Sequence, residues 1–506
     1  MCRLPPSSTA ARASGPAPHK RQRVALEEHF GAAGKGRAGD VTRLLSEEDP
    51  GCSCSGHRRK RACACGGHAV GGPSTSAPEV LHHGLRLAGK MAKAAGDAPS
   101  LKRPSVSQAL LRRAMGRVHR ERTREDFRVS CRSSMPQTWR EKELDLEVLQ
   151  RFDKAFTVRW VEPDVAYVGT KCNTLMQITP STGKVVQVPL PAAPERNVSL
   201  QAPEANPFGH CGIHSIDASP CGGLLATGGR EASDCVVLHR ETMEPVTTLV
   251  GHLDWVFGIK FLSSTRLATC SRDHTIKVWD VSTDGSYDTY DPDAASRPPL
   301  VTRWDHQGKV RAMALAQGSR RLASLGCDGT VLIWDAARMQ PSAGVQLPYR
   351  QENVCVAARD GLIACGSSSH VILMDPRAPQ STLFSVPTVD GSGGVRSLEF
   401  SDPLLSVGAG RGQVCFLDTR SMSFLPVNSA EHGAPLGAPA DGPDSWGVHL
   451  GRGHVDTNAV FRQYFRNMHV FHACHAHAWD PAGTRMIAVG GPLAYGLRGC
   501  YVGVWQ

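Results

Sequence analysis

The sequence is poor in aromatic residues, which make up 6% of its 506 residues, and it has no run of about 18 apolar residues that could cross a membrane as a helix. Its N-terminus lacks the apolar core of a secretory signal peptide. It also lacks a phosphate-binding Gly-Lys-Ser/Thr loop, a nucleophile placed beside a base, and a well-spaced set of metal ligands. These absences argue against a membrane protein and against an enzyme, and we expect a soluble intracellular protein without a metal or cofactor.

An excess of positive charge is concentrated near the N-terminus. The formal net charge is +10, and residues 1–100 carry 15 Lys and Arg against 8 Asp and Glu. This stretch is rich in Ala, Gly, Ser and Pro, so it buries too little apolar surface to fold, and we predict a disordered basic tail over 1–100. Its clusters KRQR (20–23) and RRKR (58–61) are typical of a nuclear targeting signal or of solvated charge. We therefore expect the protein in both cytoplasm and nucleus.

The same tail contains a Cys-x-Cys-x-x-His pattern twice, at 52–57 and 63–68. Thiolates and imidazoles are zinc ligands, but the usual gap of two residues between cysteines is missing. The 17 cysteines of the chain are expected to be reduced and mostly buried.

Residues 101–143 are predicted to contain one short helix, at 105–118. Ser105 can cap this helix, and Leu110, Leu111 and Met115 form an apolar stripe at helical spacing. The helix either packs on its own domain or docks on a partner.

From about residue 144 the sequence becomes a repeat. Segments that read as strand, turn and strand recur at 165–179, 224–239, 267–280, 322–335, 362–375, 404–418 and 486–505. Each follows another strand-like run, and the spacing of about 40–50 residues is typical of four-stranded propeller blades. Gly251-His252 and Trp279-Asp280 complete one WD signature, and Trp334-Asp335 repeats its ending. We predict an all-β, seven-bladed WD-repeat β-propeller over 144–506, in which His252, Asp273 and Trp279 form a structural hydrogen-bond set.

The last repeat stops after its third strand, so we predict that LDLEVLQ (144–150) supplies the missing fourth strand and closes the ring. The interruptions at 281–303 and 425–465 are then loops.

Two arginines stand where a strand should carry apolar residues: Arg311 in GKVRAMAL (308–315) and Arg396 in GGVRSLEF (393–400). The first strand of each propeller blade lines the central channel. Aligning these strands puts one residue of each blade in the same position: Thr157, His214, Phe257, Arg311, Cys355, Arg396 and His477.

Neighbouring turns add more positive charge at the same face. The cations expected there, without obvious acids to neutralise them, are Lys154, Lys171, Arg272, Lys309, Arg311 and Arg396. Each could be a solvated loop charge or pair with an acid that the sequence does not place. Together they favour an anion site, because converging cations are costly unless a ligand pairs them. A phosphopeptide, an inositol phosphate and an acidic chain end all fit, whereas few interleaved aromatics argue against nucleic acid.

Several blocks of the sequence resemble the cullin-4-associated factor 12 family of WD-repeat substrate receptors. The resemblance spans roughly 101–506 and is carried by GTKCNTL (169–175), CGIHSID (211–217), LLATGG (224–229), ENVC (352–355), GGVRSLEF (393–400) and VGGPLAYGLRGCYVGVW (489–505). It implies a non-catalytic subunit of a cullin-4 RING ubiquitin ligase, which docks on the damage-specific DNA-binding protein 1 adaptor. It also implies that the six cations bind substrate C-termini ending in two glutamates.

The resemblance assigns the adaptor side to two Asp-x-Arg blade endings and to the N-terminal helix. These residues are Asp375, Arg377, Asp418, Arg420, Leu110 and Leu111. Ordinary turn chemistry at a blade end is the alternative for the two Asp-x-Arg motifs. A scaffold that uses its basic tail on nucleic acid or chromatin is the alternative for the whole chain.

The histidine-rich run HVFHACHAHAW (469–479) departs from the family pattern. His475 and His477 share a strand face by simple alternation, which would permit a metal. Buried or channel-lining imidazoles are the preferred interpretation.

Overall fold

A computed structural model describes residues 134, 138–192, 212–282, 297–316, 318–388, 393–425 and 447–506. All of the described residues belong to one compact unit, 47–506. The predicted tail, its Cys and His repeats, and the predicted helix with Leu110 and Leu111 lie outside the described residues. No helix in the described ranges has the length and apolar composition needed to span a bilayer.

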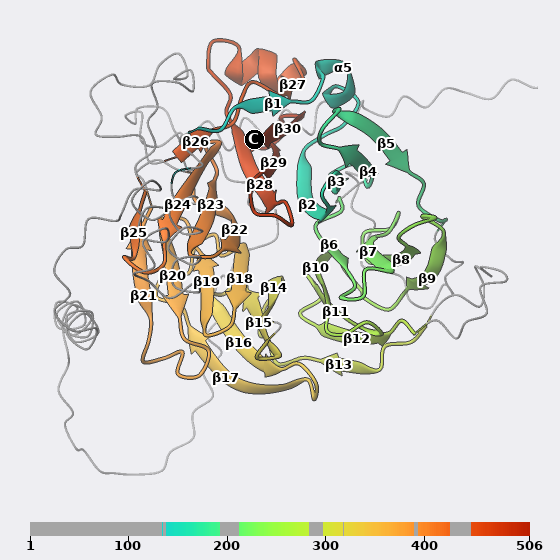
Figure 1. Ribbon diagram of the computed structural model, residues 1–506, viewed down its shortest axis with the longest axis vertical. Coiled ribbons are helices and arrows are strands. Elements are labelled where there is room, and N and C mark those ends of the chain that lie inside the picture. Colours follow the sequence, from blue (N-terminus) through green and yellow to red (C-terminus); the bar gives the residue numbers. More distant parts are fainter. Residues whose placement is uncertain are drawn as a thin grey trace, which may run out of the picture. The chain divides into compact units, whose positions relative to one another are not determined.

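Seven antiparallel sheets stand around a central axis, which confirms the predicted seven-bladed propeller (Figure 1). Blade 1 consists of β2 (Ala155–Glu162), β3 (Val165–Thr170), β4 (Leu175–Thr179) and β5 (Lys184–Val188). Blade 2 consists of β6 (Ile216–Ala218), β7 (Leu224–Gly228), β8 (Cys235–His239) and β9 (Pro245–Leu249). Blade 3 consists of β10 (Val256–Phe261), β11 (Arg266–Ser271), β12 (Ile276–Asp280) and β13 (Val301–Arg303).

The remaining blades follow the same order. Blade 4 consists of β14 (Val310–Ala316), β15 (Arg321–Gly326), β16 (Thr330–Asp335) and β17 (Gln340–Gln346). Blade 5 consists of β18 (Cys355–Arg359), β19 (Leu362–Gly366), β20 (His370–Met374) and β21 (Phe384–Pro387). Blade 6 consists of β22 (Val395–Ser401), β23 (Leu404–Ala409), β24 (Gln413–Asp418) and β25 (Ser423–Phe424). Blade 7 consists of β28 (His472–Trp479), β29 (Met486–Pro492), β30 (Gly499–Trp505) and the N-terminal β1 (Glu141–Glu143).

Two predicted loops contain more structure than expected. The region 281–303 ends in β13, and the region 425–465 contains β26 (Gly447–His449), β27 (His454–Val455) and the π-helix η5 (Phe461–Phe465). β26 pairs with β24, and β27 pairs with β30.

The ring is closed from both ends of the propeller, but by a different segment from the predicted one. β1 pairs with β30 in the register Glu141 to Trp505, so the propeller begins before residue 144. The predicted strand 144–150 instead contains the short helix α5 (Leu146–Leu149). Leu144 and Leu146 alternate with acidic residues, but the two leucines buried in the core between blades 1 and 7 are Leu144 and Leu149, which a helical turn permits. Figure 1 shows β1 beside β30.

Two glutamates hold the closing strand in place. Glu141 accepts hydrogen bonds from the Tyr501 hydroxyl and from the Gly451 N–H, the latter at 2.9 Å. Glu143 accepts the Arg452 N–H at 2.9 Å. Burial raises the pKa of Glu141 to about 7. The folded protein therefore binds this proton more tightly than the unfolded chain does.

The predicted hydrogen-bond set is present in blade 3. His252 contacts Asp273 through Nδ1 at 2.9 Å and the Thr269 hydroxyl through Nε2 at 2.7 Å. Trp279 Nε1 donates to the same hydroxyl at 2.8 Å. Burial lowers the pKa of His252, so the ring is neutral at neutral pH. His252, Asp273 and Trp279 are thus structural, with Thr269 at the centre of the set.

Replacing Thr269 with Val should destabilise the propeller by about 2–3 kcal/mol, because the isosteric change leaves the Trp279 N–H and His252 Nε2 buried without their partner. The measurement is the free energy of unfolding in denaturant. Thr269→Ser keeps the hydroxyl and should cost less. Equal losses in the two variants would contradict the role given to the hydroxyl.

Replacing Glu141 with Gln should stabilise the protein relative to wild type more at pH 8 than at pH 6. A carboxyl whose folded pKa is raised to about 7 contributes stability at low pH and loses it as the pH rises through 7. The gap between the two proteins should widen by about 1 kcal/mol over this range. Thermal unfolding of both proteins at the two pH values measures it, and a constant gap would refute the assignment.

Candidate functional site

In five blades the first strand contains a β-bulge in its first half. One extra residue of this strand has no partner on the second strand. The residues left unpaired by these register shifts are Phe156, Phe257, Arg311, Arg396 and His475. A β-bulge of this kind redirects the extra side chain. In blades 2 and 5 the equivalent residue stands just before the strand. It is His214 before β6 and Val354 before β18, as the pairing of these strands with β7 and β19 indicates. We call these seven residues the bulge ring.

Four members of the bulge ring form a continuous aromatic wall from blade 7 to blade 3. Phe156 packs edge-on against His475, with ring centroids 5.4 Å apart, and stacks on His214 at 4.7 Å. His214 contacts Phe257 at 5.1 Å. The wall ends at Arg311, whose guanidinium lies over the Phe257 ring, 4.2 Å from its centroid. One side of the channel entrance is therefore aromatic, and the other side carries Arg311 and Arg396.

The remaining expected cations lie at the same face because backbone hydrogen bonds tie each strand-entry loop to the turn between the second and third strands. Lys171 N donates to Lys154 O at 2.8 Å, and Arg272 N donates to Trp255 O at 2.8 Å. In blade 4, the N–H of Cys327 donates to Lys309 O at 2.9 Å. The structure thus brings the six predicted cations to one face, from blades 1, 3, 4 and 6.

The prediction that these cations have no acids beside them is wrong for three of the six. The ion pairs are Lys171–Asp153 at 3.8 Å, Arg272–Asp254 at 3.5 Å and Arg396–Glu352 at 2.8 Å. In the described ranges, no carboxylate forms an ion pair with Arg311. Lys154 is completely buried, so in this conformation its ammonium group is not presented at the surface.

The predicted alignment of channel residues is correct for four blades and wrong for the other three. Thr157 and Cys355 each stand one residue after the bulge position, and His477 stands two residues after it. His477 contacts the hydroxyls of Ser397 and Ser406, each at 2.7 Å, and burial lowers its pKa to about 4. It is a buried structural imidazole, and His475 takes the channel position.

Sequence reasoning therefore missed Phe156, Val354 and His475, because strict alternation leaves no place for an extra residue. The separation of His475 from His477 by this bulge also removes the shared strand face that a metal would need. In the part of the chain that the structure describes, no group of three or more His, Cys, Asp or Glu side chains could hold a metal ion.

The two Asp-x-Arg motifs lie at the opposite face, because they follow the third strands of blades 5 and 6. Arg377 contacts Asp375 through Nε at 3.0 and 3.1 Å, and 73% of its side chain is exposed. Arg420 donates to Asp418 at 3.1 and 2.8 Å, with 45% exposed and the aspartate completely buried. Both guanidinium groups are held by the turn from which they arise.

The chain enters the propeller at this same opposite face. Trp139 Nε1 donates to the carbonyl of Thr484, in the turn between β28 and β29, at 3.2 Å. Its ring packs against Phe416 and Trp479, with centroids 5.8 and 5.2 Å away. Phe416 lies two residues before Asp418, so Trp139 packs near the second Asp-x-Arg motif.

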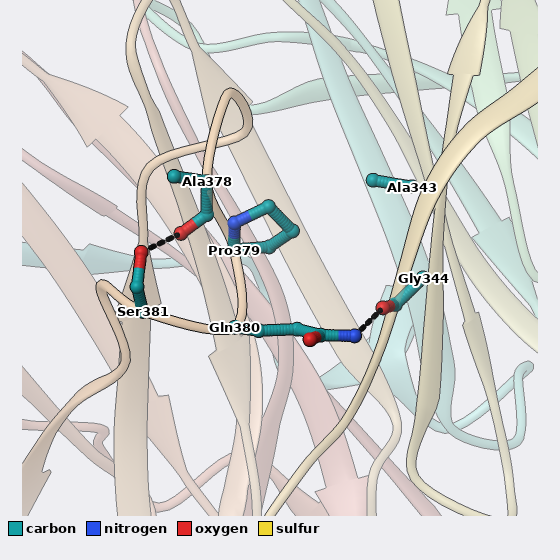
Figure 2. A pocket seen from close by; sticks show the side chains of 6 residues that line it. All are labelled: Ala343, Gly344, Ala378, Pro379, Gln380 and Ser381. Carbon is teal, nitrogen blue, oxygen red and sulfur yellow. Dashed lines mark hydrogen bonds between the residues drawn. The ribbon is translucent and has the colours of Figure 1, made fainter.

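Two cavities lie near these faces. One, of about 340 Å³, lies between β17 and the loop after β20, close to the first Asp-x-Arg motif. Figure 2 shows Gln380 spanning it, with Nε2 donating to Gly344 O at 3.1 Å. The other, of about 510 Å³, is lined by residues that include Cys172, which follows Lys171 in the sequence, Gln187 and Arg230.

Comparison with known proteins identifies the propeller. The family model described as the DDB1- and CUL4-associated factor 12 beta propeller matches residues 135–506. Pre-mRNA-processing factor 19 of Oryza sativa subsp. japonica is 27% identical over 174 residues, which is 33% of this chain and 30% of that protein. A ribosome biogenesis protein WDR12 homolog of Ixodes scapularis is 27% identical over 166 residues, 31% of this chain and 36% of that protein. A WDR12 homolog of Anopheles gambiae is 54% identical over 41 residues, 8% of this chain and 10% of that protein. The chain thus spans little more than a third of these relatives at most.

Proposed function

The chain belongs to the family of DDB1- and CUL4-associated factor 12, and on that basis we propose that it is a non-catalytic substrate receptor of a cullin-4 RING ubiquitin ligase. The substrates proposed are proteins whose C-terminus ends in two glutamates, and the adaptor proposed is DDB1. The ligase would act in the cytoplasm and nucleus, in line with the basic clusters of the tail.

The observation that carries this proposal is the placement of Arg311 and Arg396 at the channel entrance, with Lys171, Arg272 and Lys309 at the same face. A chain end with two glutamates brings three carboxylates into a small volume. Arginine binds carboxylates through its planar fork, and a charge-assisted hydrogen bond contributes about 1.5–3 kcal/mol. The aromatic wall opposite would pack against the aliphatic part of the peptide. Lys154 would contribute only through its charge or after a local rearrangement, because it is buried.

The opposite face suits the adaptor for three reasons. The Asp-x-Arg motifs present exposed arginines held at fixed positions. The chain enters the propeller beside the second motif, so a docking helix at 105–118 would start from the correct face. Substrate and adaptor would then occupy opposite ends of the channel without competing.

A labelled peptide ending in Glu-Glu should bind with micromolar affinity or better, about −8 kcal/mol, and the same peptide with an amidated C-terminus should bind at least tenfold more weakly. Arg311→Glu and Arg396→Glu should each abolish binding, since they place a negative charge against the ligand. Fluorescence polarisation measures all of these affinities.

Arg338→Glu is the matched control, because this arginine is exposed, pairs with Asp335 and lies at the other face. It should bind the peptide as wild type does. Equal binding of the free and amidated peptides, or unchanged binding by Arg311→Glu, would refute the proposed site.

The double variant Arg377→Glu and Arg420→Glu should bind DDB1 at least tenfold more weakly, because it reverses two exposed charges at the proposed adaptor face. It should still bind the Glu-Glu peptide. Co-purification and titration with DDB1 measure the first effect, and Arg338→Glu again controls for a charge reversal at the same face. Wild-type affinity of the double variant for DDB1 would contradict the assignment of this face.

A further inference from the structure

Arg396 forms the shortest of the three ion pairs described among the cations of the site. Only 11% of its side chain is exposed, and its Nη2 donates to Glu352 Oε2 at 2.8 Å. Its Nε and Nη2 also donate to the carbonyl of Gly393, at 3.2 and 3.0 Å. The ion pairs of Lys171 and Arg272 are longer, at 3.8 and 3.5 Å. A ligand carboxylate that approaches Arg396 therefore meets a guanidinium group that already binds a carboxylate.

The backbone around Glu352 is shaped to place this carboxylate. Glu352 has a φ of 56°, in the left-handed region that residues other than glycine rarely adopt. On the other side of the pair, Gly394 has a φ of 80°, and a Cβ there would lie 2.7 Å from Glu352 Oε2. The loop thus accepts a strained backbone at Glu352. Because Gly394 has no Cβ, it leaves the space that the Glu352 side chain occupies.

Arg311 differs from Arg396 although both occupy the bulge position. Arg311 lies over the Phe257 ring, and no carboxylate of the described residues pairs with it. The site therefore offers one arginine that is open to a ligand and one that is occupied by the protein's own glutamate.

We propose that Glu352 is an internal competitor of the ligand, which occupies Arg396 in the free protein and gives it up when an acidic chain end binds. This inference rests on the proposed function. A ligand with a single carboxylate can bind Arg311, but it does not displace Glu352 from Arg396. In a chain end with clustered carboxylates, one carboxylate binds Arg311. A second carboxylate is then held at a high local concentration beside Arg396, where it displaces Glu352. Glu352 is in this sense a specificity-determining residue, because it selects for several carboxylates in one small volume.

Glu352→Gln should bind a labelled Glu-Glu peptide about tenfold more tightly than wild type, since it keeps the shape of the side chain and removes its charge. The matched control is Asp375→Asn, which removes a carboxylate from an arginine pair at the opposite face and makes the same change in net charge. It should leave the affinity unchanged. Glu352→Ala is a second variant, and thermal unfolding of all variants reports whether they fold.

A double-mutant cycle with Arg396→Gln tests whether Glu352 acts through Arg396. In the Arg396→Gln background, Glu352→Gln should change the affinity by less than about twofold. A gain that persists in this background would overturn the proposed competition, because it would show a general effect of charge.

The remaining outcomes separate this inference from the proposed function. If wild type binds the peptide and neither Glu352 variant binds it more tightly, the competition is refuted and the proposed function stands. If wild type and both Glu352 variants fail to bind, both are refuted. Binding by the Glu352 variants alone would support the competition in its strongest form.

Discussion

The pairing of β1 with β30 is the constraint on which the candidate site depends. The bulge ring draws one residue from each of seven blades, and these residues become neighbours only when the ring is closed. Phe156 of blade 1 and His475 of blade 7 lie 5.4 Å apart across the point where the two ends meet. Closure also removes the free sheet edges that would otherwise pair with other chains. A strand of three residues therefore determines whether the wall of the channel is continuous.

Much of the fold could be predicted from the sequence because each blade contains its own local signals. Alternating apolar residues, turn residues and the Trp-Asp endings identify the strands without knowledge of their neighbours. The closing strand was misplaced because Leu144, Leu146 and Val148 alternate with polar residues in a segment that contains a helical turn, and the turn buries Leu144 and Leu149 while it exposes Leu146. Alternation alone does not distinguish a strand from a short turn that buries two leucines in one core.

The candidate site was predicted only in part, for a different physical reason. Arg311 and Arg396 were identified because a cation in an apolar strand is conspicuous, and both do occupy the bulge position. Phe156 and His475 were missed because a single extra residue shifts every later side chain to the other face. The alternation of apolar residues along one strand does not reveal a bulge, because the extra residue has no partner on the neighbouring strand.

The acids of the site show how the free protein tolerates converging cations. Asp153, Asp254 and Glu352 all lie in loops that enter a first strand, two or three residues before it begins. Asp153 and Asp254 pair with Lys171 and Arg272 in a turn of their own blade, whereas Glu352 pairs with Arg396 of the next blade. Their effect is to lower the repulsion among cations that the fold brings together. Binding of an acidic ligand is then an exchange of carboxylates, and its strength depends on the difference between two sets of ion pairs.

The two faces of the propeller differ in how their charges are fixed. At the Asp-x-Arg face, each arginine pairs with an aspartate two residues earlier in the same turn, so the arrangement is local. At the cation face, Arg396 of blade 6 pairs with Glu352 of the loop entering blade 5, so the arrangement depends on how blades pack. A local pair survives distortion of the ring, whereas a pair between blades does not. Loosening of the contact between β1 and β30 should therefore alter the pair of Arg396 with Glu352 at the cation face. The arginines of the Asp-x-Arg face should keep their geometry, so the two faces respond separately to a distortion of the ring.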